Sequence, residues 1–419
     1  MNRLILYPSD IYGNINIGGA KNSALKLLVA SILTNEKVFL CNYPSTMLDI
    51  IIQENMLQYL GKKIIKDSSE NCIEISGIAD KSDLIWEGRS IRNTLLILGC
   101  LLSKNGFGKV PLPGGCSLGE RKYDIHVNLM EAMGANVSEE EGYLYAENKR
   151  IKKRLKAVEY HLPIRSTGAT ENAIMMGCLA EGVSRIWNPH IRPEILDLIS
   201  MLKKMGAKIE VRGQESIIIE GVNFLGSVNH CIIPDNMQAF TYLMAGAIAG
   251  KKLLISNFPF KDLEIPLIFL KNSGLKYYEY ENELLISRCE HFPIDISTGP
   301  FPGINSDMQP LFAVWGALSK GKSVITDLRF VERYGYIVEM SKMGIISETS
   351  DNKLIINGGY PIKGAEVTAI DLRAGAALIL LSLVADSETI INDFWMIERG
   401  YDNIFNALKS INVIVKSCD

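Results

Sequence analysis

The chain has 419 residues, of which 47% are hydrophobic and 22% charged, and its formal net charge at pH 7 is -3. This is the composition of a globular protein that is too long for one hydrophobic core, so we expect two domains. The small net charge gives no electrostatic reason to expect a nucleic acid or an anionic membrane as a partner.

The apolar segments and the cysteines predict a cytoplasmic protein. The opening residues MNRLILYPSDIYG hold too short an apolar run for a signal peptide. The longest uncharged apolar stretch, residues 374–385, is far below membrane-spanning length. The eight cysteines are scattered singly without a CxxC pair, a pattern that disfavours a zinc site or a disulfide scaffold and fits a reducing compartment.

Six segments repeat one order of predicted elements, at a spacing of about 70 residues that is too long for a solenoid. Each has a polar start, an apolar helix, a strand, a second helix, and in five of the six a glycine before a further strand. The segments begin near Lys21, Arg92, Gly168, Asn236, Ser306 and Asp371. Their first helices are apolar nearly all round, so each should be buried on every side. We expect an α/β protein with three units in each domain.

A glycine-rich loop lies in the second unit. The stretch Leu112–Arg121 holds one thiol, Cys116, among three glycines, and Arg121 and Lys122 end it. Glycines let the backbone move, and neighbouring cations favour the thiolate and attract an anionic substrate. The alternative is a buried cysteine beside a turn.

Polar residues that are unusual beside a core gather at the starts of the units. They are Lys21, Asn22, Arg92, Ser166, Thr167, Asp307, Asp371 and Arg373, and two more cations, Arg333 and Arg399, lie in connecting segments. Helix N-termini carry free N–H groups and the positive end of the helix dipole, so they favour anions. If these starts converge, they form a cationic cleft for a small substrate that carries carboxylate and phosphate groups.

Plainer interpretations stay open for single residues. Asp371 has the position of a helix N-cap, and Arg399 is also placed to pair with Glu398 or Asp402 on the surface. The histidines stand at positions 126, 161, 190, 230 and 291, without metal-ligand or catalytic-triad spacing. Metal-dependent and serine-hydrolase chemistry therefore have no support in the sequence.

With these motifs assembled, the chain resembles the enolpyruvyl transferase family, and within it the UDP-N-acetylglucosamine 1-carboxyvinyltransferases. The resemblance covers essentially the full length and rests on GAKNSA, LPGGCSLGERKYDIH, STGATEN, RPEILDLISMLKKMGA, SDMQP, DLRAG and ERGYD, in the family's order. It implies two inside-out α/β barrels built from six βαβαββ-like repeats, three in each domain. One domain would comprise residues 1–20 and 230–419, and the other residues 21–229.

The resemblance implies transfer of the enolpyruvyl group of phosphoenolpyruvate to the 3-hydroxyl of UDP-N-acetylglucosamine. Phosphate would leave by addition–elimination in the first committed step of peptidoglycan synthesis, without a metal or organic cofactor. Cys116 would be the general acid and the target of the epoxide fosfomycin, and Asp307 would help to remove the hydroxyl proton. Lys21 and Asn22 would bind phosphoenolpyruvate, with Arg399 assisting. The further substrate-binding positions implied are Arg92, Arg121, Lys122, Tyr123, Asp124, Ile125, Ile164, Arg165, Ser166, Thr167, Arg329, Arg333, Asp371 and Arg373.

The chain departs from the family mainly on the acceptor side. Lys122 and Tyr123 replace a Pro-Val pair, and Arg329 stands where a small apolar residue contacts the amino sugar. Asn236 and Gln238 also differ from the usual motif. Two alternatives therefore stay open: an enolpyruvyl transferase that uses another nucleotide or sugar hydroxyl, such as UMP in specialised metabolism, and an inactive sugar-nucleotide-binding paralogue.

Overall fold

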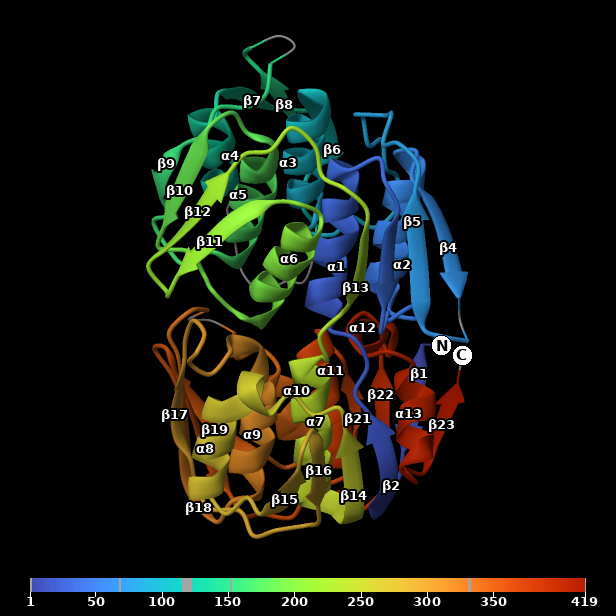
Figure 1. Ribbon diagram of the computed structural model, residues 1–419. Helices are drawn as coiled ribbons and strands as arrows, with labels where there is room; N and C mark the ends of the chain where they lie inside the picture. Colours follow the sequence, from blue (N-terminus) through green and yellow to red (C-terminus); the bar gives the residue numbers. More distant parts are fainter. Residues whose placement is uncertain (1, 68, 115–122, 151–152, 331–332, 419) are drawn as a thin grey trace.

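The computed structural model describes residues 2–67, 69–114, 123–150, 153–330 and 333–418. The chain forms two lobes stacked one above the other, with helices inside and sheets outside (Figure 1). Helices α1 to α6 lie in the upper lobe and α7 to α13 in the lower lobe, and both ends of the chain lie near the boundary between the lobes. In this part of the chain there are five four-stranded sheets and one three-stranded sheet.

The upper lobe contains three sheets. Its helices are α1 (Lys21–Ala30), η1 (Ser31–Leu33), α2 (Leu48–Tyr59), α3 (Thr94–Asn105), α4 (Asp124–Ala132), α5 (Thr167–Leu179) and α6 (Pro193–Lys204). The first sheet has the order β13 (Val228–Cys231), β3 (Val38–Cys41), β5 (Cys72–Ser76), β4 (Lys63–Asp67). The second has the order β9 (Glu159–His161), β10 (Val183–Trp187), β12 (Ser216–Glu220), β11 (Lys208–Arg212). The third has the order β6 (Phe107–Pro111), β8 (Tyr143–Asn148), β7 (Ala135–Glu140).

The lower lobe repeats this plan. Its helices are α7 (Asn236–Ala249), η2 (Phe260–Leu263), α8 (Glu264–Asn272), η3 (Ser306–Met308), α9 (Gln309–Leu318), α10 (Ile337–Lys342), α11 (Leu372–Ser382), α12 (Trp395–Glu398) and α13 (Ile404–Ser410). Its sheets have the orders β2 (Ile11–Asn16), β14 (Gly250–Ser256), β16 (Glu283–Ile286), β15 (Tyr277–Tyr280); β17 (Asp295–Thr298), β18 (Gly321–Asp327), β20 (Lys353–Gly358), β19 (Ile346–Ser350); and β21 (Glu366–Thr368), β22 (Thr389–Asn392), β1 (Arg3–Leu6), β23 (Val415–Cys418).

One pairing pattern recurs in all the sheets. In each four-stranded sheet the first pair of strands is parallel and the other pairs are antiparallel. The three-stranded sheet keeps its parallel neighbour only as a single bridge between Asp83 and Lys109. The six βαβαββ-like units and the α/β class predicted from the sequence are therefore confirmed.

Each unit turns from its second helix into its next strand through a residue with positive φ. These residues are Gly61, Gly134, Gly206, Gly274 and Gly344 in five units, and Asn412 in the sixth, where φ is 66°. Glycine is the usual residue at such a helix end, and asparagine tolerates the same conformation. The sixth unit therefore keeps the turn without the glycine that marks the other five.

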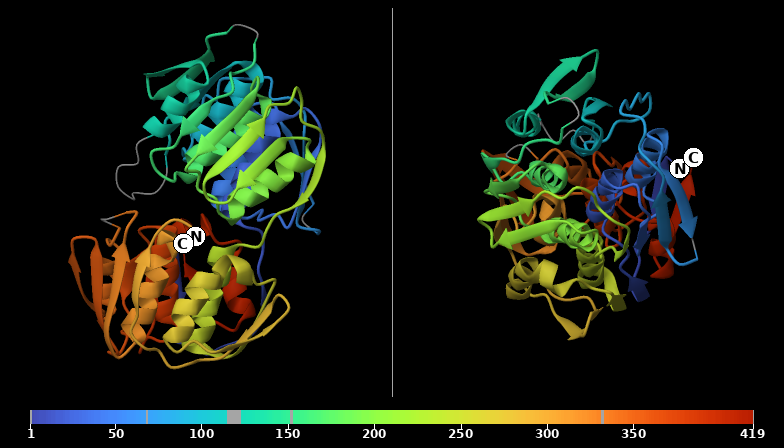
Figure 2. Two further views of the ribbon diagram at one scale, coloured as in Figure 1. Left: turned by 60° about the vertical axis from the view of Figure 1, so that its left-hand side comes forward. Right: turned by 45° about the horizontal axis from the view of Figure 1, so that its top comes forward.

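The first helix of each unit lies at the centre of its lobe. Helices α3 and α5 pack together in the upper lobe, and α9 and α11 in the lower lobe. Every residue of α7 and α11 is buried. This confirms the burial predicted from their uniformly apolar sequences. The N-termini of the central helices lie toward the boundary between the lobes (Figure 2).

The chain crosses between the lobes twice, and the two crossings are bonded to each other. The Ala20 N–H donates to Ile233 O at 2.8 Å, and the Asp235 N–H donates to Gly18 O at 2.9 Å. A Cβ on Gly19 would come within 1.8 Å of Asn42 O, so only glycine fits this close approach. The buried apolar residues of one core all lie between positions 24 and 232. Those of the other core lie within residues 4–17 and 237–415. We propose domains of residues 1–20 with 230–419 and of residues 21–229. The two cores agree with this division except at residues 230–232, because β13 pairs with β3 and Ile232 packs in the upper core.

None of the helices in the described part of the chain has both the length and the apolar character that a membrane span requires.

Candidate active site

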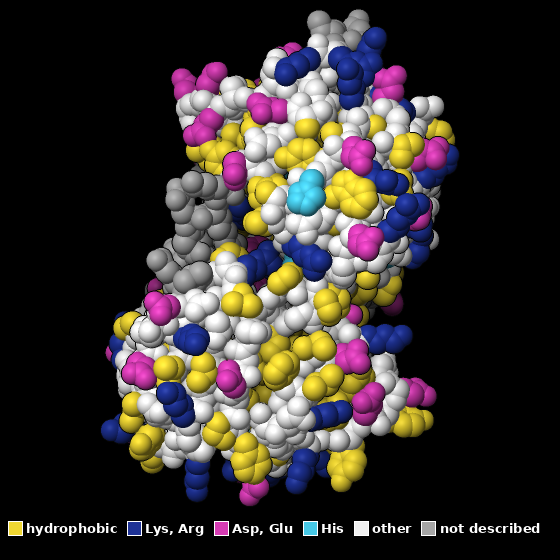
Figure 3. Space-filling view, turned by 90° about the vertical axis from the view of Figure 1, so that its left-hand side faces the viewer, with side chains coloured by type: hydrophobic (Ala, Val, Ile, Leu, Met, Phe, Trp, Pro, Cys, Tyr) yellow, Lys and Arg dark blue, Asp and Glu magenta, His cyan; other side chains and the backbone are white. Residues whose placement is uncertain are grey.

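Polar side chains from both lobes meet where the central helices begin. Among them are six buried or partly buried charged residues that we call the reaction cluster: Lys21, Asp49, Asp307, Arg333, Arg373 and Arg399. Viewed from one side, Lys and Arg side chains gather at the boundary between the lobes (Figure 3). The convergence of helix starts that the repeats predict therefore occurs.

A buried carboxylate of the upper lobe joins cations of both lobes. Lys21 is the first residue of α1, and its Nζ lies 2.6 Å from Asp49 Oδ2. Arg399, which follows α12 in the lower lobe, donates from Nε to Asp49 Oδ1 at 2.9 Å. Burial raises the pKa of Asp49, but Lys21 and Arg399 outweigh burial and hold that pKa below its usual value. The carboxylate therefore stays ionised and fixes both cations.

Asp49 is central to the cluster, although the sequence did not predict it as a site residue. It stands in the segment MLDII, where the acidic residue near the start of α2 has the pattern of an ordinary helix N-terminus. The surface pairing considered for Arg399 is replaced by this buried bridge. Asp402 instead accepts the backbone N–H of Thr46 at 3.1 Å.

A second carboxylate, Asp307, lies among guanidinium groups. Arg333 donates from Nη1 to Asp307 Oδ1 at 2.7 Å. Burial raises the pKa of Asp307, but Arg333 and Arg373, with Arg192 of the upper lobe, outweigh burial and hold that pKa well below its usual value. Asp307 is therefore an ionised hydrogen-bond acceptor that arginines of both lobes surround.

Helix α11 presents both a cap and a cation. Asp371 accepts the N–H groups of Arg373 at 2.7 Å and Ala374 at 2.8 Å, so it is the N-cap. Arg373 is 1% exposed and lies over the Tyr401 ring, at 5.2 Å from its centroid. Its Nε and Nη1 find no hydrogen-bond partner among the described residues. Because buried donors are nearly always paired in proteins, these two atoms are suited to the oxygens of a bound anion.

The start of α7 is tied to the start of α1. Asp235 caps α7, since its Oδ1 accepts the N–H groups of Met237 and Gln238 at 2.9 Å each. Its Oδ2 accepts the Lys21 N–H at 2.9 Å. Asn236 and Gln238, which depart from the family motif, are buried in the first turn of α7. Asn22 follows Lys21 in α1 and is half-buried.

The residues expected to hold the acceptor are less buried. Ser166 caps α5 by accepting the Ala169 N–H at 3.3 Å, and Thr167 Oγ1 lies 2.8 Å from His190 Nδ1. Arg165 Nε lies 3.4 Å from Asn188 Oδ1, and the side chain of Ile164 is 62% exposed. These neighbours therefore share one segment at the start of α5 and lie close to His190.

The other expected acceptor positions in the upper lobe lie at or just before the starts of α3 and α4. The Tyr123 hydroxyl donates to Glu139 Oε2 in β7. Asp124 is exposed at the start of α4, and Ile125 packs in part against the upper core. Burial, with the charge of Arg92, lowers the pKa of His126 to about 3. Arg92 therefore lies at the start of α3 beside the buried His126.

Arg329 of the lower lobe faces the same region. Its backbone N–H donates to Asp327 Oδ1 at 2.8 Å. Burial lowers the pKa of His190 to about 3, with further lowering by Arg192, Arg329 and Arg165. Arg329 therefore contributes positive charge on the acceptor side. Three of the expected site residues, Cys116, Arg121 and Lys122, lie outside the described residues.

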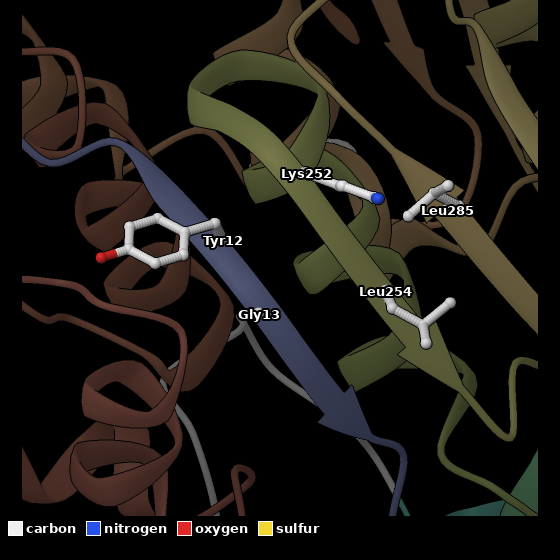
Figure 4. Close-up of a pocket in the computed structure, with 5 residues that line it drawn as sticks. All are labelled: Tyr12, Gly13, Lys252, Leu254 and Leu285. Atoms are coloured by element: carbon white, nitrogen blue, oxygen red, sulfur yellow. The ribbon is translucent and has the colours of Figure 1, made fainter.

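Two further observations concern other kinds of site. Among the described residues, no group of three or more His, Cys, Asp or Glu side chains is arranged to hold a metal ion. An open apolar hollow lies on the β2–β14–β16 sheet of the lower lobe, lined by Tyr12, Gly13, Lys252, Leu254 and Leu285 (Figure 4). It holds no carboxylate and one cation, so it lacks the groups that the reaction cluster provides.

Comparison with solved structures identifies the fold. The crystal structure of the enolpyruvyl transferase NikO from Streptomyces tendae matches with a TM-score of 0.89 at 21% identity, over 99% of this chain and 98% of that chain. EPSP synthase from Acinetobacter baumannii matches with a TM-score of 0.76 at 16% identity, over the whole of both chains. The fold is therefore that of the enolpyruvyl transferases.

Sequence comparison places the chain within that class. Residues 6–408 match the family model described as EPSP synthase (3-phosphoshikimate 1-carboxyvinyltransferase). A UDP-N-acetylglucosamine 1-carboxyvinyltransferase of Prochlorococcus marinus (strain MIT 9312) is 38% identical, over 98% of this chain and 90% of the relative. One of Granulibacter bethesdensis is 35% identical, over 95% of this chain and 94% of the relative. The chain belongs to the EPSP synthase family of enolpyruvyl transferases, as its motifs predict.

Proposed function

We propose that this enzyme transfers the enolpyruvyl group of phosphoenolpyruvate to the 3-hydroxyl of UDP-N-acetylglucosamine and releases phosphate. Relatives that carry this activity in their names are 34–38% identical over nearly the whole chain. The observation that carries the proposal is the group formed by the partly buried Asp307 with the buried Arg333 and Arg373. It offers an ionised carboxylate beside guanidinium N–H groups that have no partner among the described residues.

Phosphoenolpyruvate fits a cluster built from both lobes. Its phosphate and carboxylate are anions, and charge-assisted hydrogen bonds from Lys21, Arg373 and Arg399 would hold them. We assign Asn22, Arg121 and Arg333 to the same half of the site. Since Lys21 belongs to the upper lobe and Arg399 to the lower, both lobes must be in place for this substrate to bind.

The reaction divides into an addition and an elimination. An acid first gives a proton to the methylene carbon of phosphoenolpyruvate, and we assign this role to Cys116. The acceptor hydroxyl then bonds to the neighbouring cationic carbon, and its proton passes to Asp307. In the elimination, the new methyl group loses a proton, the carbon–oxygen bond to phosphate breaks, and the double bond returns. The surrounding arginines stabilise the phosphate that leaves.

Substrate binding would strengthen Asp307 as a base. The field of Arg333 and Arg373 now depresses the pKa of its carboxyl. Phosphoenolpyruvate brings several negative charges to the same arginines, so it opposes their field and lets the pKa of Asp307 rise. The carboxylate would then accept the hydroxyl proton more readily, at the stage when the proton must leave.

We assign the acceptor to the surface between the starts of α3, α4 and α5 and the lower lobe. The positions concerned are Arg92, Tyr123, Asp124, Ile125, Ile164, Arg165, Ser166, Thr167, Arg329 and Lys122. We further propose that the enzyme works in the cytoplasm on these small molecules, without a nucleic acid, metal or organic cofactor. We assign Asp371 a positioning role, because as the N-cap of α11 it accepts the Arg373 N–H and fixes that residue in the first turn.

Release of phosphate from phosphoenolpyruvate tests the proposal directly. The assay compares UDP-N-acetylglucosamine, UMP and no acceptor, with mass spectrometry of the products. We expect release only with UDP-N-acetylglucosamine and a product that carries one enolpyruvyl group. Preference for UMP would replace the acceptor in the proposal, and no release with either would overturn the reaction.

Fosfomycin tests the role of the loop thiol. A thiolate beside Arg121 and Lys122 should open the epoxide, so one molecule should add to each chain, at Cys116. Intact-mass measurement followed by peptide mapping checks this, with Cys116→Ser as the control. An adduct on another cysteine would contradict the assignment.

A further inference from the structure

We infer that His190 is a positioning residue that couples the acceptor-binding segment at the start of α5 to the loop that carries Asp307. It makes one hydrogen bond to each. Its Nδ1 lies 2.8 Å from Thr167 Oγ1 in the upper lobe, and its Nε2 accepts the backbone N–H of Phe301 in the lower lobe at 3.0 Å. This inference rests on the proposed function, because it names a residue that sets how the same site assembles.

The two bonds fix the state of the imidazole ring. Since Nε2 accepts from Phe301, a neutral ring must carry its proton on Nδ1, and it donates that proton to Thr167 Oγ1. The ring is 1% exposed, and burial together with three nearby arginines lowers its pKa to about 3. The neutral form that both bonds require is therefore the one present near neutral pH. The Thr167 hydroxyl keeps its own hydrogen for another acceptor, such as an oxygen of the sugar nucleotide.

The loop that His190 contacts leads straight to Asp307. Gly299 N–H donates to Ile304 O at 2.8 Å, so the loop closes on itself with Phe301 near its tip. Asn305 follows and accepts the Asp307 N–H at 3.1 Å as the cap of η3. A displacement of Phe301 should therefore move Asp307 as well, because a short hydrogen-bonded segment joins the two residues.

The contact lies between the two lobes, and other links join the lobes elsewhere. Arg399 bonds Asp49, and Thr46 bonds Asp402 and Asn403 at an exposed position. Among these, the His190 contact is the one that starts at an expected acceptor residue, Thr167. We infer that an acceptor that orders Thr167 also orders His190, which favours the arrangement of lobes that completes the phosphoenolpyruvate site.

Two near-isosteric variants separate the two bonds. His190→Asn places an amide where Nδ1 was, so it keeps the contact with Thr167 and loses that with Phe301. His190→Gln reaches Phe301 and loses the contact with Thr167. Thr46→Val is the matched control, because it removes exposed hydrogen bonds between the lobes that involve neither substrate region.

Steady-state kinetics with both substrates, together with calorimetric binding of UDP-N-acetylglucosamine, tests the inference. His190→Asn should raise the KM for phosphoenolpyruvate about fivefold, the effect of about one net hydrogen bond, and leave acceptor affinity within about twofold. His190→Gln breaks the same link at its Thr167 end, so it should weaken acceptor binding and also raise the KM for phosphoenolpyruvate by a similar factor. At saturating substrates kcat should stay near the wild-type value, because ligand binding restores the competent arrangement by mass action.

Small-angle scattering gives a readout that does not need turnover. His190→Asn should have a larger radius of gyration than the wild type and Thr46→Val. If both His190 variants merely lower kcat and thermal stability, or if Thr46→Val shows the same KM change, the inference is wrong. If the wild type releases no phosphate with any acceptor, the proposed function fails, and the scattering comparison still decides the role of His190.

Discussion

The reaction cluster and the acceptor-side residues are held in different ways. Asp49 and Asp307 lie in ion pairs with arginines, and Arg373 is almost completely buried. On the acceptor side, Ile164 and Asp124 are exposed, and Arg165 has a long contact of 3.4 Å with Asn188 Oδ1. Charges that stabilise a reaction must be fixed before the substrate arrives, whereas a binding surface can order around its ligand. Tyr123 and Arg329, which depart from the family, therefore fall on the half that tolerates change, whereas the departures at Asn236 and Gln238 are buried in the first turn of α7.

The largest expected effect on turnover comes from replacing the proposed base, Asp307. Asp307→Asn removes the proton acceptor and leaves Arg333 without its anionic partner. We expect kcat to fall at least about 100-fold, the usual contribution of a positioned base. Affinity for UDP-N-acetylglucosamine in calorimetry should change little. Turnover near the wild-type rate would remove Asp307 from the chemistry.

Removing Asp49, the buried carboxylate of the cluster, should destabilise the fold instead. Asp49→Asn removes the carboxylate that pairs with the buried Lys21 and Arg399, and removal of one partner of a buried ion pair costs about 3–5 kcal/mol. Urea unfolding measures this cost. Inorganic phosphate should recover more stability in the variant than in the wild type, because an anion replaces the missing charge. Asp402→Asn, at a half-buried position between the lobes, should change the stability by less than about 1 kcal/mol.

Much of the fold could be predicted from the sequence, because the same order of helices and strands recurs in six segments of the chain. The uniformly apolar helices and the recurrent glycines each follow from local rules that tertiary contacts do not overturn. The chain crossings follow less easily, because strand β2 joins a sheet whose other strands lie more than 230 residues later. A pairing of that kind leaves no local trace, and the domain division rested on the resemblance.

The site was predictable where function demands unusual residues. Charged side chains are unusual at the start of an apolar helix, and this makes Lys21, Asp307 and Arg373 stand out. Asp49 and His190 did not stand out, since an acidic residue in a first helical turn and an isolated histidine are ordinary features. Their roles come from contacts with residues 350 and 111 positions away, which spacing along the chain does not reveal.

A smaller effect is expected on the acceptor side, where one substitution sharpens the comparison. Arg329→Val removes a cation from the region around His190 and restores the small apolar residue of the family. Loss of one charge-assisted contact to a nucleotide phosphate should weaken UMP binding about tenfold. Affinity for UDP-N-acetylglucosamine should hold or improve. Calorimetry with both nucleotides checks this, and equal changes for the two would show that Arg329 does not discriminate between them.

The smallest effect on turnover concerns a buried carboxyl that belongs to neither region. Glu171 in α5 is 2% exposed, and its nearest cation, Lys26 Nζ, is 3.9 Å away. Burial outweighs that distant cation and raises the pKa of Glu171 to about 7, the opposite of the close pairing at Asp49 and Asp307. A carboxyl with a raised pKa holds its proton in the folded state, so stability is full below about pH 4.5 and falls as the pH rises through about 7.

Glu171→Gln removes this pH-dependent loss. Relative to the wild type, the variant should gain about 2–3 kcal/mol of unfolding free energy in urea between about pH 5 and about pH 8. Glu194→Gln is the control in the same lobe. Its carboxylate binds Arg192 at 2.6 Å, so its loss should destabilise the protein at both pH values. A Glu171→Gln variant that is less stable at about pH 8 would show that Lys26 stabilises the charged carboxyl. The contrast with Asp49 and Asp307 would then be one of degree, because all three carboxylates would be held ionised by cations.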